Sequence, residues 1–149
     1  MRKLLAGLLL IILIVSIIAV FFTYTQTTQE EIRLRNDIQY RSTLLAVSLR
    51  ETVEPNFINK SESYLQNVVE RYADKERIAG LSIIDNKGAN IAVSSALPKN
   101  IQKAQVIADE VMDADKAAGE FVKFQDRKFF VFAIPLHDEA SVVGSLMIV

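Results

Sequence analysis

An apolar run near the N-terminus constrains this chain more than any other feature. Residues 4–22, LLAGLLLIILIVSIIAVFF, hold no charged side chain, and Ser16 carries their only hydroxyl. A helix rises about 1.5 Å per residue, so this run would extend roughly 28 Å, close to the roughly 30 Å hydrocarbon core of a bilayer. The run, which includes Leu4, Leu13 and Phe22, therefore predicts a transmembrane anchor surrounded by membrane lipid.

Charged residues on the two sides of the run predict its orientation. Arg2 and Lys3 precede it, whereas residues 23–29 carry no charge, and basic flanks favour the cytoplasmic side. We therefore expect a single pass through the inner (cytoplasmic) membrane, with the N-terminus inside and the following domain in the periplasm or extracellular space. A cleaved signal peptide is the alternative, but it has an apolar region of about 7–15 residues and a small-residue cleavage site, which this run lacks.

The charge balance argues against a nucleic-acid partner. The 149 residues hold 17 basic and 18 acidic side chains, and two of the basic ones precede the run, so the remainder carries 15 basic against 18 acidic groups, a net charge of −3. No basic stripe is evident, and nucleic-acid binding depends on neutralising phosphates. Roughly 125 residues remain outside the anchor, which is the size of one ordinary domain.

A long helix is expected to follow the anchor. Neither glycine nor proline occurs between Gly7 and Pro55, so no strong breaker interrupts it. One interpretation is a rod that pairs with a second copy to give a homodimer; the other is an amphipathic helix packed on its own domain, and the two are compatible. Arg41 lies within the apolar face and weakens a coiled-coil interpretation. That face consists of Leu34, Ile38, Leu45, Leu49 and Val53.

The long helix is expected to end at Glu54-Pro55, because proline disfavours the helical conformation in the residue before it. A second helix is expected to start near Asn59, since Asn59 and Glu62 have the spacing of a capping box. Its buried face is predicted from residues at helical spacing, which are Leu65, Val68, Val69 and Tyr72. The expected domains are a cytoplasmic tip and anchor (1–24), a membrane-proximal helix (25–54) and a folded domain (55–149).

From Ile78 the apolar pattern changes to that of strands. Residues 80–85 and 89–94 predict a β-hairpin whose turn, 86–88, ends in Gly88, a residue that tolerates positive φ. A helix is expected between residues 96 and 119, followed by strands at 120–125, 128–136 and 141–149, with Asp126-Arg127 as the turn between the first two. Five short strands joined mainly by hairpins predict an α+β fold with one antiparallel sheet and covering helices.

Several motifs follow one another in a characteristic order: the anchor, the membrane-proximal helix, Asp85-x-x-Gly88, Val93-Ser94-Ser95, FVFAIPLHD at 130–138 and VVGSLMI at 142–148. Together, over residues 26–149, they resemble the Cache, or extracytoplasmic PAS-like, sensor domains of bacterial membrane receptors. The resemblance implies a five-stranded sheet with the long helix on one face and a small-ligand pocket on the other. It also implies a second transmembrane helix and an output domain such as a histidine kinase, cyclase or methyl-accepting domain.

A second resemblance involves residues 37–50 (DIQYRSTLLAVSLR) and 73–81 (ADKERIAGL). These stretches are similar to the N-terminal membrane region fused to some bacterial trehalose-phosphate synthase-type glycosyltransferases. Two functions are therefore weighed. The first is an extracytoplasmic sensory input domain that couples a stimulus to an output domain outside this chain. The alternative is a passive membrane anchor and dimerisation module of a larger enzyme.

No catalytic constellation is found, and the sequence does not predict an enzyme. Five scattered glycines make no phosphate loop, and one histidine without any cysteine provides no usual zinc ligand set, so no metal or cofactor is expected. His137 is expected in a solvated turn, with pH sensing as a further role. Asp85 either holds a ligand or, more commonly for Asp-x-x-Gly, bonds its own turn. The other candidate ligand-binding residues flank the hairpin and are Tyr72, Arg77, Ser94 and Ser95.

Overall fold

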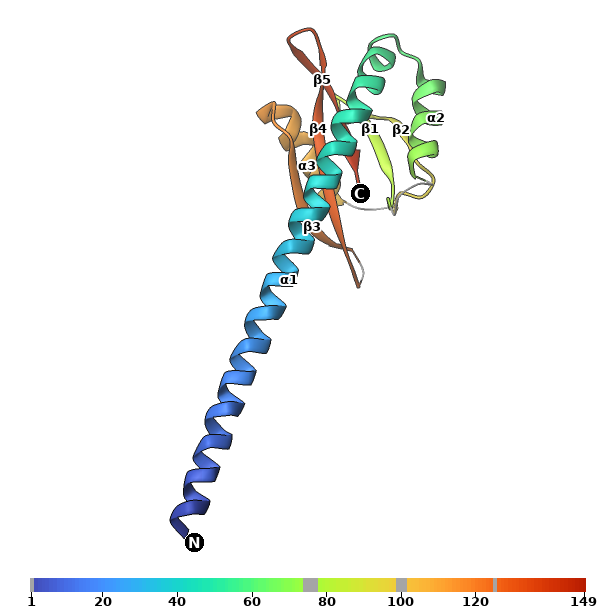
Figure 1. Ribbon diagram of the computed structural model, residues 1–149. Coiled ribbons are helices and arrows are strands. Elements are labelled where there is room, and N and C mark those ends of the chain that lie inside the picture. Colours follow the sequence, from blue (N-terminus) through green and yellow to red (C-terminus); the bar gives the residue numbers. More distant parts are fainter. Residues whose placement is uncertain (1, 74–77, 99–101, 125) are drawn as a thin grey trace. The chain divides into compact units, whose positions relative to one another are not determined.

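The computed structural model describes most of the chain, namely residues 2–73, 78–98, 102–124 and 126–149. Within these ranges it does not describe the side chains of residues 2–11, 20–31 and 102–103. The chain separates into two compact units, Met1–Asp37 and Ile38–Val149. Helix α1 (Arg2–Ile58) belongs to both units, and the second unit holds the remaining elements (Figure 1). The domain boundaries expected after residues 24 and 54 stay predictions.

The first unit consists of the N-terminal part of α1. Its described side chains, at residues 12–19 and 32–37, are exposed, and Leu13 is among them. The side chains of Leu4 and Phe22 lie outside the described residues. Over the part of the chain that the structure describes, no helix is both long and apolar enough to cross a membrane. The membrane anchor therefore stays a prediction.

The prediction that the long helix ends at Glu54-Pro55 is wrong. Helix α1 includes Pro55 and continues to Ile58. Proline lacks the backbone N–H that would join it to the preceding turn, but the same turn gains another bond, because the Nδ2 of Asn56 donates to the Thr52 carbonyl at 2.8 Å. Proline in a last turn therefore does not stop this helix.

The actual stop lies between α1 and α2 (Glu62–Ala73). Lys60 adopts a positive φ of 54°, a conformation that ends many helices. Asn59 was expected to cap the second helix, and that prediction is also wrong: its Nδ2 donates to the Pro55 carbonyl at 2.8 Å and so closes α1. The carbonyl of Ser61 accepts the first backbone bonds of α2 instead.

The five predicted strands are present and form one antiparallel sheet in the order β2-β1-β5-β4-β3. The predicted α+β fold class and the covering helices are therefore confirmed. The strands are β1 (Leu81–Asp85), β2 (Asn90–Val93), β3 (Ala118–Phe124), β4 (Arg127–Asp138) and β5 (Ser141–Ile148).

The two tight turns differ in how well their positions were predicted. Gly88 has a φ of +79° in the β1–β2 turn, as expected. The turn between β3 and β4 was predicted at Asp126-Arg127, but Arg127 already pairs with Phe124 as the first residue of β4. The prediction is therefore wrong at Arg127, and Gln125, the residue before Asp126, lies outside the described residues.

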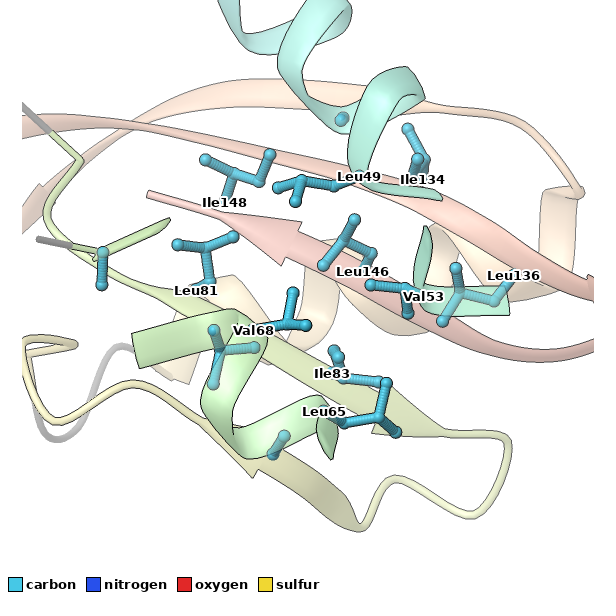
Figure 2. Packing of buried hydrophobic residues seen from close by; sticks show 14 of the residues in the cluster. Leu49, Val53, Leu65, Val68, Leu81, Ile83, Ile134, Leu136, Leu146 and Ile148 are labelled. Atoms are coloured by element: carbon cyan, nitrogen blue, oxygen red, sulfur yellow. The ribbon is translucent and has the colours of Figure 1, made fainter. Parts of the chain in front are cut away.

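Both faces of the sheet are covered by helices. The second-unit part of α1 and helix α2 cover one face, where Leu49 and Val53 of α1 point at strand side chains (Figure 2). Helix α3 (Gln102–Ala114) covers the other face. The α1/α2 face is built mainly from Leu49, Val53, Leu65, Val69, Leu81, Ile83, Ile134, Leu136, Leu146 and Ile148. The α3 face is built from Ala104, Ile107, Val111, Val122, Val131, Ala133, Met147 and Val149.

Candidate functional site

Asp85 holds the turn of the β1–β2 hairpin. Its Oδ1 accepts the backbone N–H of Lys87 at 2.9 Å and that of Ala89 at 2.8 Å, and the N–H of Gly88 donates to the Asp85 carbonyl at 3.0 Å. These bonds occupy the carboxylate in the way that an Asp at the start of a tight turn commonly does. The geometry thus favours the turn-holding interpretation of Asp85 over the ligand-holding one.

Removing the Asp85 carboxylate is expected to destabilise the domain. Asp85→Ala leaves two backbone donors without their acceptor, which costs about 1–2 kcal/mol. Asp85→Asn keeps the Oδ1 acceptor and should lose less than half as much. Urea unfolding followed by far-UV circular dichroism measures both. Equal stability of the alanine variant and the parent protein would contradict the turn-holding role.

Ser94 and Ser95, which directly follow β2, both make hydrogen bonds within the domain. Ser94 is 2% exposed, and its Oγ accepts the Leu81 N–H at 2.9 Å. Ser95 is exposed, and its N–H and Oγ both donate to the carboxylate of Glu70 on α2, each at 2.9 Å. The Gln66 amide, one turn earlier on α2, pairs with both backbone groups of Val93, at 2.8 and 3.1 Å.

Gln66 thus covers the outer edge of β2 at Val93, and Glu70 holds Ser95 just beyond the strand, a role that the sequence interpretation missed. Their i, i+4 spacing on an amphipathic helix was the only available signal, and it does not identify the strand they meet. Of the other candidate residues, Tyr72 is half-buried against the α1/α2 face, and Arg77 lies outside the described residues. A ligand-binding role for any of these residues stays a prediction.

The α3 face of the sheet carries two buried hydroxyls. Side chains alternate along a strand, so Ser145, two residues before Met147 on β5, lies on the α3 face with it. By the same alternation Ser82 lies opposite Leu81 and Ile83, on the α3 side. The Oγ of Ser82 donates to Asn90 Oδ1 at 3.0 Å, whereas the Oγ of Ser145 has no hydrogen-bond partner among the described residues. A buried hydroxyl without a partner costs free energy of folding, so its presence needs a physical explanation.

His137 does not lie in the predicted turn but within β4, which continues to Asp138. Its ring contacts Asp115 and Glu54, a cluster that the sequence could not reveal because the three residues are far apart along the chain. Within the described residues no group of three or more His, Asp or Glu side chains is arranged to hold a metal ion.

No protein-family model matches the chain, and no curated protein matches it in sequence. Solved structures do match. The sensor domain of the V. cholerae histidine kinase DctB superposes with a TM-score of 0.51 at 16% identity, over 71% of this chain and 44% of that domain. The E. coli DcuS sensor domain gives a TM-score of 0.45 at 13% identity, over 69% of this chain and 82% of that domain.

The chain thus has a Cache/PAS-like sensor-domain fold, as the sequence resemblance predicts. It spans less than half the length of the DctB sensor domain. The similarity to the trehalose-phosphate synthase fusions is not tested by these comparisons and stays a prediction.

Proposed function

We propose that this chain is the extracytoplasmic sensory input domain of a membrane-anchored signal-transduction protein. The observation that supports this most is the arrangement of the second unit: a sheet in the order β2-β1-β5-β4-β3 with α1 on one face and α3 on the other. The V. cholerae domain that shares this fold is the sensor domain of a histidine kinase. In this proposal, residues 4–22 anchor the chain in the inner membrane and the sheet domain lies in the periplasm.

The proposed input site is the α3 face, at Ser145. A small ligand with a polar group would give the buried Ser145 hydroxyl the partner that the described residues do not provide. Because the rest of this face is apolar except for Ser82, whose hydroxyl is already bonded to Asn90, we expect a compact, mostly apolar metabolite with one or two polar atoms. Binding would shift the position of α3, and α1 would carry the change towards the membrane as a homodimer.

The test is a thermal-shift screen of the whole chain in detergent micelles against small metabolites. A receptor should show a raised Tm for at least one compound, because a ligand at 100 times its Kd stabilises by about 2.7 kcal/mol. Ser145→Ala is the matched control: the fold should remain at least as stable, since an unpaired hydroxyl is removed, while the ligand response should fall. A uniform lack of response across a broad library would favour the passive anchor and dimerisation module instead.

A further inference from the structure

Strand β3 forms an open edge of the sheet. The strand order places β2 and β3 at the two edges (Figure 1). At the β2 edge the Gln66 amide bonds both backbone groups of Val93, whereas β3, which is seven residues long, pairs with β4 alone among the described strands. Proteins usually cover or blunt such edges, because an edge strand can pair with another chain. The β3 edge is therefore the place where this sheet can accept a further strand.

The bonding of β5 shows which residues of β3 turn their backbone groups outward. Directly after β5, the Val149 N–H donates to the Gly80 carbonyl at 2.9 Å, and within β5 the Val143 carbonyl accepts the Asn86 N–H at 3.0 Å. Odd-numbered residues of β5 thus bond towards β1, and bonded residues alternate in antiparallel pairs. Even-numbered residues of β5 therefore bond to even-numbered residues of β4, and odd-numbered residues of β4 bond to even-numbered residues of β3.

The odd-numbered residues of β3, Gly119 and Lys123 among them, consequently direct their N–H and C=O groups to the outer edge. Among the described residues, no backbone or side-chain group bonds these outward groups of Gly119 and Lys123. An extended segment laid along β3 can pair with both residues at once, because two strands rise by nearly the same distance per residue.

The α3 side of this edge is acidic. Side chains alternate along a strand, so Glu120, two residues before the buried Val122, lies on the α3 side, where it is exposed. On α3, the Gln105 amide donates to the Gly88 carbonyl in the β1–β2 turn at 3.2 Å. The exposed Glu110, five positions after Gln105, lies on the opposite flank of the helix, towards β3. Side chains that a docked segment turns to this side should therefore be basic.

The α1 side of the edge is apolar. Phe121, a neighbour of Glu120 in the strand, points to this side and is half-buried. Glu54 on α1 accepts the backbone N–H of His137 on β4 at 3.0 Å, so this flank of α1 is turned towards the side of the sheet that carries β3. Val47 and Tyr40, two and four turns earlier on the same flank, are 41% and 65% exposed. Side chains that a docked segment turns to this side should be apolar.

We propose that the β3 edge is a docking site for an extended segment of a partner protein in which basic and apolar residues alternate, and that this segment adds a sixth strand to the sheet. Main-chain bonds at Gly119 and Lys123 supply affinity, and the unlike faces of the edge select the side chains. A second copy of β3 fits less well, because it brings its own Glu120 to the acidic side, and like charges across a strand pair are unfavourable.

A peptide probe tests the docking by fluorescence anisotropy, with the full chain in nonionic detergent micelles. A labelled eight-residue Lys-Val repeat should bind, and a Glu-Val repeat should bind about tenfold more weakly because its charge is reversed. Two further Lys-Val repeats carry N-methyl groups, one on the valines and one on the lysines. One of them should lose about tenfold in affinity and the other should not, because only one edge of the peptide faces β3. Equal binding of both methylated repeats and the parent peptide would overturn the proposal.

Two proline variants of the same hairpin provide the matched comparison within the chain. Lys123→Pro removes an outward N–H from an edge strand, a position where proline is tolerated, and should weaken binding of the Lys-Val repeat about tenfold. Lys128 lies opposite Lys123 and turns its backbone groups away from β3, before the pairing of β4 with β5 begins, so Lys128→Pro should bind like the parent protein. Lys123→Gln removes the charge but keeps the N–H, and should bind at least as tightly as the parent protein. If the two proline variants bind alike, the β3 edge is not the site.

Glu120→Lys tests the charge selection independently of proline and of any loss of folding that proline causes. It should reduce the preference for the Lys-Val over the Glu-Val repeat about tenfold, and an unchanged preference would contradict the proposal. Sedimentation velocity of the chain without peptide examines the other occupant. A dimer that Lys123→Pro dissociates and Lys128→Pro does not would assign the edge to a second copy and overturn the proposal.

Discussion

Truncating Leu49 to alanine is expected to cost about 3 kcal/mol of unfolding free energy, within the roughly 2–5 kcal/mol range for buried Leu→Ala changes. Leu49 is 1% exposed and lies between α1 and the sheet (Figure 2). Its removal leaves a cavity that the surrounding strands can close only in part, because side chains from α1, α2 and the sheet meet there. Chemical denaturation followed by circular dichroism measures the loss.

Leu44→Ala is the matched control for this prediction. Leu44 is on the same helix and undergoes the same Leu→Ala change, but its side chain is 54% exposed. Its truncation should cost well under about 1 kcal/mol. If the two variants lose similar amounts, then α1 is stabilised by its own helix formation and is not held by the sheet. A sensory role for α1 would lose its physical basis in that case, since a helix that does not bear on the sheet cannot report on it.

The repeating patterns of the sequence account for most of the fold. Short runs of branched and apolar residues in β1, β4 and β5 and the Asp85-x-x-Gly88 turn predicted the strands and the hairpin, because a strand covered on both faces is apolar along its length. Helical spacing likewise predicted Leu65, Val68 and Val69 as buried residues of α2, whereas the predicted Tyr72 is half-buried and Ala73 is buried instead. In α1 the same spacing succeeded at Leu49 and Val53, which are buried, but not at Leu34, which is 63% exposed.

The errors arose where tertiary contacts or single side chains override local preference. Pro55 was expected to end α1, but local preference does not include the extra bond from Asn56 to Thr52. Asn59 is a residue type that commonly caps the start of a helix, but here its side chain bonds the last turn of the preceding helix. Both bonds join residues four positions apart. Each asparagine can bond more than one nearby backbone group, and the sequence alone does not say which group it bonds.

The candidate sites were harder to predict than the fold because some of their contacts join residues that are far apart in the sequence. Asp85 was recognised because its partners are only two and four residues away. Glu54 and His137 are 83 positions apart, and nothing in the sequence joins them. The Ser145 hydroxyl, which has no hydrogen-bond partner among the described residues, has no sequence signal either, because a serine in a strand can lie on a buried or on an exposed face.

Gly144→Ala is expected to destabilise the domain by about 3 kcal/mol, at the upper end of the range for overpacking. A Cβ at Gly144 would clash with the carbonyl oxygen of Ile84 and would lie 3.1 Å from the ring of Phe57. The first contact is with backbone, so β1 and β5 would have to separate where they pair. The second is with the last turn of α1, so the same methyl group would lift that helix from the sheet.

Gly119→Ala provides the comparison, because it introduces the same methyl group and the same change in the unfolded chain. There the nearest atoms are ring atoms of Phe130 and Phe132, at 2.6 and 2.7 Å, and no backbone atom is among the nearest contacts. Rings at the end of a side chain can turn aside more easily than paired strands, so a loss of about 1 kcal/mol is expected. Denaturant midpoints at equal slope measure both variants. A smaller loss of unfolding free energy at Gly144 than at Gly119 would contradict this prediction. It would mean that β1 and β5 can separate at little cost, and that α1 packs on a deformable part of the sheet.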